Sequence, residues 1–329
     1  MKTRIPLLLT IVLALGLGGA TGIAQATAPS DGLVVAKAGK AGKPHWPGHR
    51  PGKIILGMSC GSQCTAKERE LGQNYGVHRQ FTGWAAWDSV VKKIRASHAQ
   101  GRLPWISVKG PGGPAGWRAI GSGKHDAKIR QLAKALKAND RKPIILTFHH
   151  EPSNDGTEAQ GKDWARANNR FRNVLGKKHA LANVAFAPVL GDWLFNKQNK
   201  GQNPANWARK SVLKRASFLG IDLYENDSGE TFAQRMPRIL KWLARQGFPN
   251  KMIGIGEMGG TDSRYPKKSA VEFINESFSW AKKHTDKVGV VSYFNSMANS
   301  RAGVHWPLDE SNPKVHTYRN WLGHPRFAS

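Results

Sequence analysis

From residue 53 onward, short apolar runs alternate with longer amphipathic stretches. Eight of the runs have the length and the β-branched or aromatic composition of strands, and most of them lack polar alternation. They span residues 53–58, 77–82, 103–108, 143–149, 183–188, 216–222, 251–256 and 288–294. This pattern predicts parallel strands that are buried on both faces.

The stretches between the runs carry apolar residues at helical spacing, which predicts a helix after most strands. The clearest sets are Ile129, Leu132 and Leu136; Val271, Ile274 and Phe278; Val90, Val91 and Ile94; and a last helix over 313–322. Eight strand–helix units in about 275 residues match a single-domain α/β fold, the (β/α)8 TIM barrel. A doubly wound parallel sheet has the same local pattern and is the alternative fold.

Polar side chains gather where several predicted strands end. The fourth strand ends in "PIILTFHHEP", the sixth in "FLGIDLYEND", the seventh in "KMIGIGEMGG" and the eighth in "SYFNS". The ends carry His149, His150, Glu151, Asp222, Tyr224, Glu257, Phe294 and Asn295. In a barrel the carboxyl ends of all strands share one mouth, so these groups are expected to converge there.

Glu151 and Glu257 are the carboxyl pair that this arrangement brings together. Glycoside hydrolysis needs one protonated carboxyl to serve the leaving oxygen and one ionised carboxyl to attack or to activate water. A retaining enzyme holds the two carboxyls about 5–5.5 Å apart. Glu257 as a salt-bridged barrel residue and Asp222 as a structural partner are the plainer alternatives.

The segments around these strand ends resemble glycoside hydrolase family 26, whose barrels carry the acid/base on strand four and the nucleophile on strand seven. The resemblance covers most of residues 54–324 and is strongest in "GSGKHDAKIRQLAKALKANDRKPIILTFHHEP", "FLGIDLYEND", "KMIGIGEMGG" and "GVVSYFNS". It implies that Glu151 is the acid/base, preceded by His150, and that Glu257 is the nucleophile, supported by Tyr224. The implied function is a secreted retaining hydrolase of β-linked polysaccharide, with β-mannan first and β-glucan or xylan next.

The chain departs from the family pattern in two places. "EPSNDG" follows the strand-four position where family mannanases commonly have Met-Asn-Gly, and no strand-eight tryptophan is evident, although Phe294 and Asn295 stand nearby. Substrate preference is therefore less well specified than chemistry, and endo or exo action is left open. Trp84, Trp193 and Trp306 lie in loops after strands, where indoles can form platforms for sugar rings or simply anchor the loops.

Two further interpretations of the strand ends concern metal and binding. His149, His150 and Asp222 could ligate a metal, but no third histidine follows at a suitable spacing. We therefore predict neither a metal nor a cofactor. A non-hydrolytic barrel that binds an anionic envelope polymer, and a neighbouring barrel enzyme acting on an acidic polymer, are the alternative functions.

The N-terminal stretch predicts export. Lys2 and Arg4 precede an apolar run, and Ala24-Gln25-Ala26 matches a cleavage site, so residues 1–26 are predicted to be a signal peptide and the mature protein to be secreted. Residues 27–52 are rich in Gly, Pro, Ala and Lys and predict a flexible tail, with the catalytic domain at 53–329. Cys60 and Cys64 are the two cysteines, and an exported protein is expected to join them in a disulfide.

The charge of the chain adds a possible partner. The formal net charge is +28, and most of it falls on residues 53–329 rather than on the tail. Such a surface attracts polyanions, so an anionic cell-wall polymer is a candidate partner beside the polysaccharide substrate. The sequence carries no nucleic-acid motif and no later apolar run long enough for a membrane span, and we expect a monomer. A solubilising charge with no dedicated partner is the plainer interpretation.

Overall fold

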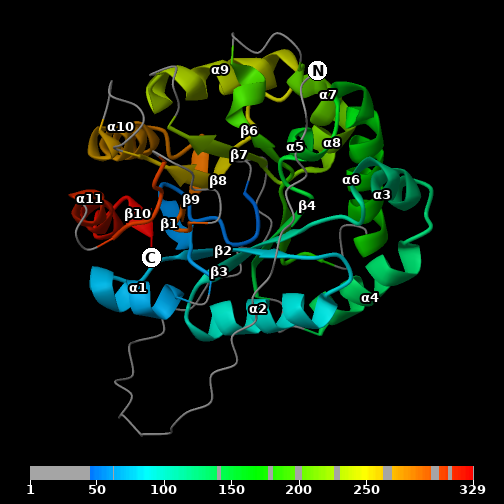
Figure 1. Ribbon diagram of the computed structural model, residues 1–329, viewed down its shortest axis with the longest axis horizontal. Coiled ribbons are helices and arrows are strands. Elements are labelled where there is room, and N and C mark those ends of the chain that lie inside the picture. The colour runs from blue at the N-terminus through cyan, green and yellow to red at the C-terminus, as the bar shows by residue number, and fades with distance from the viewer. Residues whose placement is uncertain are drawn as a thin grey trace, which may run out of the picture. The chain divides into compact units, whose positions relative to one another are not determined.

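Parallel strands surrounded by helices form the part of the chain that the computed structural model describes (Figure 1). It describes residues 45–61, 63–138, 142–176, 181–196, 202–225, 230–261, 269–297, 304–309 and 313–328. The predicted signal peptide and residues 27–44 of the predicted tail lie outside the described residues. No helix within those ranges has both the length and the apolar character that a bilayer crossing requires.

Every strand pairing is parallel, in the order β5-β4-β3-β2-β1-β9-β8-β7-β6, and β10 pairs with β1 beside this path. The strands are β1 Ile54–Ser59, β2 Val77–Thr82, β3 Leu103–Val108, β4 Ile144–Phe148, β5 Val184–Phe186, β6 Val189–Gly191, β7 Leu219–Tyr224, β8 Ile253–Gly259, β9 Val288–Phe294 and β10 Phe327–Ala328. All eight predicted strands are present, the last with the predicted bounds.

The two ends of this sheet are consecutive pieces of one strand, and that closes the barrel. The Ala187 N–H donates to Leu146 O at 3.0 Å on the β4 side, while the Gly220 N–H donates to Pro188 O at 2.8 Å on the β7 side. Proline has no N–H for a ladder, so the strand is interrupted between β5 and β6. The (β/α)8 prediction is confirmed, and the open doubly wound alternative is wrong because the sheet has no free ends. In barrel order, β8 is the seventh strand and β9 the eighth.

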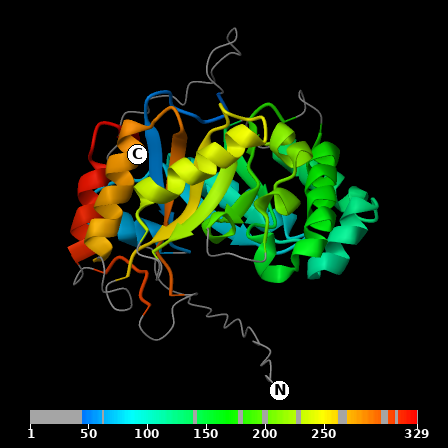
Figure 2. The ribbon, with the colours of Figure 1, turned by 90° about the horizontal axis from the view of Figure 1, so that it is seen from above.

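The helices ring the strands, as Figures 1 and 2 show. They are α1 Cys64–Leu71, α2 Trp87–Ala99, α3 Gly113–Gly121, α4 Asp126–Lys137, α5 Pro152–Asp155, α6 Gly161–Leu175, α7 Pro204–Trp207, α8 Lys210–Arg215, α9 Phe232–Arg245, α10 Ala270–Lys283 and α11 Pro313–Leu322, with 3-10 turns η1 Glu158–Gln160 and η2 Asp192–Phe195. Thr231 and Ser269 begin α9 and α10 with capping boxes, which satisfy free N–H groups of the first turn.

The predicted inward faces of the helices are mostly correct. Ile129, Leu132 and Leu136 of α4 are fully buried. In α10 and α2 the predicted set is off by part of a turn: Val271 and Val91 are only partly buried, and Phe273 belongs to the α10 core face. Residues at i and i+1 compete for the edge of an apolar stripe, and the packing against the sheet decides between them.

The interior of the barrel has its own apolar core, separate from the larger one between strands and helices. Its members are Trp46, Ile55, Val77, Leu103, Trp105, Ile145, Ala185, Ala187, Val189, Phe218, Met252 and Val290. Trp46 is 5% exposed, and its ring centroid lies 4.8 Å from that of Phe218. The packed chain therefore begins upstream of residue 53, and the end of the predicted tail is part of the barrel core.

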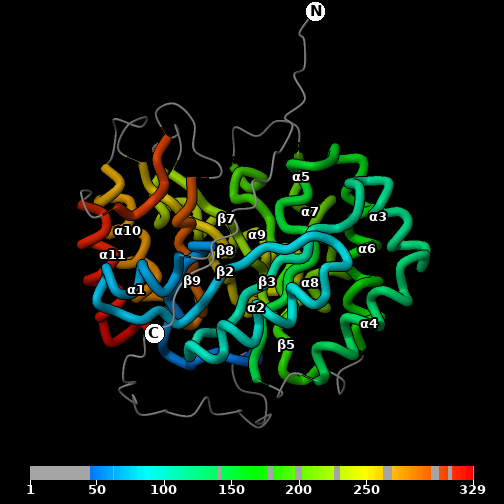
Figure 3. Tube along the Cα trace, turned by 60° about the horizontal axis from the view of Figure 1, so that its bottom comes forward, coloured from blue at the N-terminus to red at the C-terminus, as the bar shows by residue number. Residues whose placement is uncertain are grey.

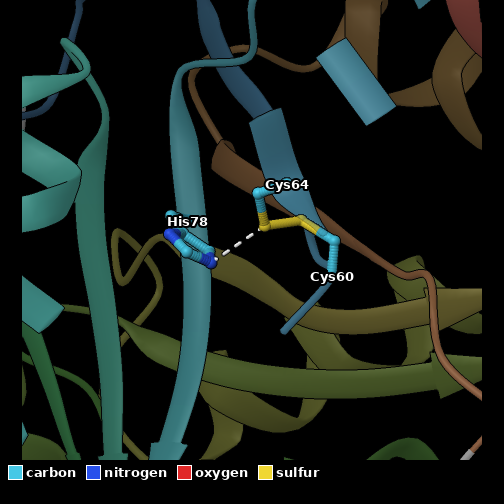
Figure 4. Close-up of side chains that lie close together, drawn as sticks. All are labelled: Cys60, Cys64 and His78. Carbon is cyan, nitrogen blue, oxygen red and sulfur yellow. Dashed lines mark hydrogen bonds between the residues drawn. A yellow bond between two sulfur atoms is a disulfide. The ribbon is translucent and has the colours of Figure 1, made fainter. Parts of the chain in front are cut away.

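Cys60 and Cys64 form the predicted disulfide, which joins the end of β1 to the first residue of α1 (Figure 4). The buried Tyr75 hydroxyl donates to Cys60 Sγ at 2.9 Å. His78 Nε2 lies 3.0 Å from Cys64 Sγ, and burial lowers the pKa of His78 to about 4. Among the described residues, these two cysteines and His78 are the one group spaced to hold a metal, but disulfide sulfurs are not thiolate ligands.

Candidate active site

Glu151 follows β4 on an unusual stretch of backbone. His149 and Glu151 both have positive φ, +43° and +46°, in the left-handed region that costs a non-glycine residue on the order of 1–3 kcal/mol. The Glu151 N–H donates to Val189 O at 3.0 Å, which ties this turn to β6. Asn154 Nδ2 donates to Glu151 Oε2 at 3.0 Å. The Glu151 residue is partly exposed; its backbone is tied to β6, and its carboxyl is held by Asn154 of α5.

Glu257 lies within β8, and its side chain is 3% exposed. The Tyr224 hydroxyl donates to Glu257 Oε2 at 2.6 Å. Arg79 Nη2 lies 3.7 Å and His150 Nε2 3.9 Å from Glu257 Oε1. The Arg79 guanidinium and the Tyr224 hydroxyl therefore favour the ionised form of this carboxyl, as a carboxylate nucleophile requires.

The surroundings give the two carboxyls different affinities for a proton. Burial, followed by the charge of Glu257, raises the pKa of Glu151 to about 8. Burial also raises the pKa of Glu257, but the Arg79 guanidinium and the Tyr224 hydroxyl oppose that rise. A pair of carboxyls with divided roles is the pattern of an acid and a nucleophile that share one site.

Asp222 adds a third carboxyl below this pair. It faces Glu257 in the register of β7 and β8, and its side chain is 1% exposed. Burial, followed by the charges of Glu257 and Glu151, raises the pKa of Asp222 well above its ordinary value. A Cβ at Gly256 would lie 2.5 Å from Asp222 Oδ1, so only glycine leaves room there. Asp222 is therefore a buried neighbour of Glu257, removed from solvent.

The two histidines of the strand-four end point to different places. His149 Nδ1 accepts from the Gly110 N–H at 3.0 Å, and its Nε2 donates to Asp155 Oδ2 at 2.8 Å. At 1% exposure it braces the turn, so its prediction as a substrate contact is corrected. His150 is the histidine that faces Glu257, and burial followed by the Arg79 charge lowers its pKa well below the usual value.

An aromatic wall stands beside Glu257. The ring of Tyr224 lies 4.8 Å from Trp306 and 5.8 Å from Phe294, centroid to centroid. Trp306 belongs to the loop after β9, so a tryptophan does accompany the eighth barrel strand, although it is distant in sequence from the strand end. Asn295 Oδ1 accepts from the Leu308 N–H at 2.7 Å and thereby holds this loop rather than the mouth.

The other two predicted platforms differ from each other. Trp193 lies in η2, directly after β6, and is 46% exposed. Trp84 is packed against the core, with its ring 5.3 Å from Trp87 and 6.3 Å from Phe148. Trp193 is therefore the indole that can meet a ligand, and Trp84 anchors the loop after β2.

Sequence reasoning missed Arg79 and Phe81, which β2 places in the site. Arg79 is 1% exposed, donates from Nη1 to Ser107 Oγ at 2.7 Å, and lies over the rings of Phe81 and Trp105. The Phe81 ring lies 5.1 Å from that of His150. The available signal was the alternation of "VHRQFT", which puts Arg79 on the same face as two apolar residues.

Comparison with known proteins supports the fold. No family model and no curated protein matches the sequence. Among solved structures, an endo-β-1,4-mannanase double mutant from Cellulomonas fimi matches with a TM-score of 0.59 at 14% identity, over 84% of this chain and 72% of that one. A family 26 β-mannanase from Bacteroides ovatus matches with a TM-score of 0.54 at 13% identity, over 84% and 90%.

A third neighbour has a different named activity. A triple mutant of an endo-β-1,4-glucanase from Xanthomonas axonopodis pv. citri matches with a TM-score of 0.57 at 11% identity, over 82% of this chain and 99% of that one. At these identities the likeness shows the fold: this chain has the barrel of the family 26 glycoside hydrolases.

Proposed function

We propose that this chain is a retaining glycoside hydrolase that cleaves a β-linked polysaccharide by double displacement. The observation that carries the proposal is the pair Glu151 and Glu257, at the ends of the fourth and seventh barrel strands, in surroundings that divide their proton affinities. The family 26 fold and the predicted roles of the two residues agree with it. No metal or cofactor is part of the proposed chemistry.

In the first step the protonated Glu151 gives its proton to the glycosidic oxygen while a Glu257 carboxylate oxygen bonds to the anomeric carbon. The carbon–oxygen bond to the leaving sugar breaks, and a glycosyl-enzyme ester remains. In the second step the Glu151 carboxylate takes a proton from water, the water oxygen bonds to the anomeric carbon, and Glu257 leaves. Arg79 and Tyr224 stabilise the Glu257 carboxylate in both the free and the departing state.

The proposed substrate preference rests on the activities named for the similar solved structures and on the aromatic residues of the mouth. β-Mannan is the first choice and β-glucan or xylan the next, with Tyr224, Trp306 and Phe294 beside the reacting sugar and Trp193 farther along the mouth. His150 has a buried Nδ1 without a hydrogen-bond partner among the described residues, which suits a sugar hydroxyl. We also propose that the enzyme acts as a secreted monomer after cleavage near Ala26.

A panel of polysaccharides tests the proposal. The full chain is incubated with β-mannan, mixed-linked β-glucan and xylan, and reducing ends are measured with time. We expect reducing ends from at least one of them, and none above background from the Glu151→Ala/Glu257→Ala double variant. Product sizes then distinguish endo from exo action. Binding without any hydrolysis across the panel, or equal hydrolysis by the double variant, would contradict the proposal.

A further inference from the structure

A groove on the outside of the barrel carries a concentration of positive charge. It runs along α6, has a volume of about 420 Å³ and lies beside α3 and α8; Figure 3 shows these three helices together. Its lining consists of Gly121, Lys162, Ala165, Arg166, Asn169, Arg170, Asn173, Arg209 and Ser211. Four of these residues are cationic and none is acidic.

The lining residues of α6 follow helical spacing, so they form one stripe. Lys162, Arg166, Asn169 and Asn173 recur at intervals of three or four positions. The stripe from 162 to 173 is about 17 Å long at 1.5 Å per residue. An extended polymer can therefore contact several of its side chains at once.

Most of the cations in this groove are not neutralised by the protein. Arg170 pairs with Asp126 of α4. Lys162, Arg166 and Arg209 are exposed and have no ion pair within the described part of the chain. Neighbouring charges of one sign repel each other, so an anionic ligand would relieve a repulsion as well as gain contacts.

The groove is braced before any ligand arrives. Asn169 Nδ2 donates to Ser211 Oγ at 2.9 Å, and Arg215 Nε donates to Asn173 Oδ1 at 3.3 Å, which ties α6 to α8. On the other side the Arg166 stem lies against Gly121 of α3, where an added Cβ would be 2.9 Å from Arg166 Cδ. A preformed site loses less entropy on binding than a flexible one.

The groove and the mouth carry different ionisable groups. The carboxyls of Glu151, Glu257 and Asp222 gather at the mouth, where the charges of both glutamates raise the pKa of Asp222. The lining of the groove instead has four cationic side chains and no carboxylate. A polyanion is therefore favoured on α6, whose first residue follows Glu151 by one short helix and a 3-10 turn.

We propose that the α6 groove is an anchoring site for an anionic polysaccharide that bears carboxylates or phosphates, separate from the site of cleavage. Arginine forks match the planar oxygens of both groups. Nucleic acid fits less well, because the lining contains no aromatic side chain on which bases could stack. The proposal does not depend on the hydrolase activity, because the two sites share no residue.

The test compares two pairs of exposed cations. Lys162→Ala/Arg166→Ala removes one lysine and one arginine from the groove, and Lys92→Ala/Arg95→Ala removes the same from the exposed face of α2. Affinity of the full chain is measured for polygalacturonate, a poly(glycerol phosphate), β-mannan and a single-stranded DNA oligonucleotide, at low and at high salt. Arg209→Ala, on a separate element, is a third variant, and thermal melting checks the fold of each.

We expect the groove variant to lose roughly tenfold or more of its affinity for at least one of the two anionic glycans, since charge-assisted contacts are the strong ones. The α2 variant is expected to lose less than about threefold, and Arg209→Ala an intermediate amount, all diminishing as salt screens the charges. The two glycan arms separate carboxylate from phosphate recognition.

Equal losses in the groove and α2 variants, tighter groove-dependent binding of DNA than of either glycan, or binding unchanged in molar salt would overturn the proposal. Because binding is read without turnover, its failure is distinguishable from failure of the hydrolase.

Discussion

The strand-four end and the strand-seven end present the same chemical group in opposite settings. Glu151 follows β4 on left-handed backbone, is partly exposed, and is contacted by an amide. Glu257 lies within β8 where its register with β7 and β9 shifts, is buried, and is contacted by a guanidinium and a phenol. The first setting favours a carboxyl that keeps its proton, and the second stabilises one that has lost it.

The difference teaches that residue type alone does not assign a role at this mouth. Burial raises the pKa of both side chains, although Glu151 keeps some exposed surface. Arg79 lowers the pKa of both carboxyls, so what separates them is the hydrogen bond that Tyr224 donates to Glu257 and the charge of Glu257, which raises the pKa of Glu151. The five predictions that follow test whether this asymmetry gives the two carboxyls their different roles.

Loss of the Glu257 carboxyl is expected to have the largest effect on turnover. Glu257→Ala removes the atom that would bond to the anomeric carbon, so turnover should fall by a factor on the order of 10⁶, the scale seen when a covalent nucleophile is removed. The fall should be similar for natural and activated aryl substrates. Glu70→Ala, which removes a carboxyl from α1 on the outside of the barrel, is the control. Normal turnover of either substrate by Glu257→Ala would contradict the assignment.

The effect of losing the Glu151 carboxyl on turnover should depend on the leaving group of the substrate. Glu151→Ala should slow polysaccharide cleavage by roughly 10²–10⁴, because general acid–base catalysis is lost. An activated aryl glycoside needs little protonation, so its first step should survive and the glycosyl-enzyme should accumulate, visible by mass spectrometry.

Azide rescue distinguishes the role of Glu151 from that of Glu257. It needs no base, so it should rescue Glu151→Ala and give a glycosyl azide of retained configuration, whereas in Glu257→Ala it can give only the inverted product. The configurations are read by NMR. The reverse stereochemistry would exchange the two roles, and no rescue in either folded variant would count against both.

Tyr224→Phe should narrow the difference in pKa between Glu151 and Glu257. A hydrogen bond to the ionised form lowers a carboxyl pKa, so its loss should raise the pKa of Glu257 further. Since Glu257 must be ionised, the rising acid limb of kcat/KM should move to higher pH, with a loss on the order of tenfold at the optimum. Tyr318→Phe, which loses a buried hydrogen bond to Gly57 O elsewhere, is the control and should leave the limb in place.

The smallest effect concerns stability. The folded pKa of Glu151, about 8, lies above its ordinary value of 4.5, so the folded state binds the proton more tightly than the unfolded state does. Stability from this group is present below pH 4.5, is lost as pH rises toward 8, and is absent above it. Glu151→Gln carries no charge, so its melting temperature should exceed that of the parent by more at pH 9 than at pH 5, by a few degrees. An equal difference at both pH values would show that Glu151 ionises without cost.

The alternation of strands and helices, the barrel class and the positions of the two glutamates near strand ends could be predicted from the chain because each rests on local pattern. Apolar runs of strand length report burial on both faces, and a carboxyl directly after such a run has to lie at a strand end. The disulfide likewise followed from two nearby cysteines in a chain whose N-terminal stretch predicts export. These signals need no knowledge of which elements touch.

Only the tertiary structure decided how side chains from different strands meet. It placed Arg79 against Glu257 across 178 positions of sequence, turned His149 toward Asp155 and His150 toward Glu257, and packed Trp46 into the barrel. It also brought the loop residue Trp306 onto Tyr224. Periodicity within an element fixes a face, but the contacts across a barrel depend on its closure and strand tilt, which are properties of the whole sheet.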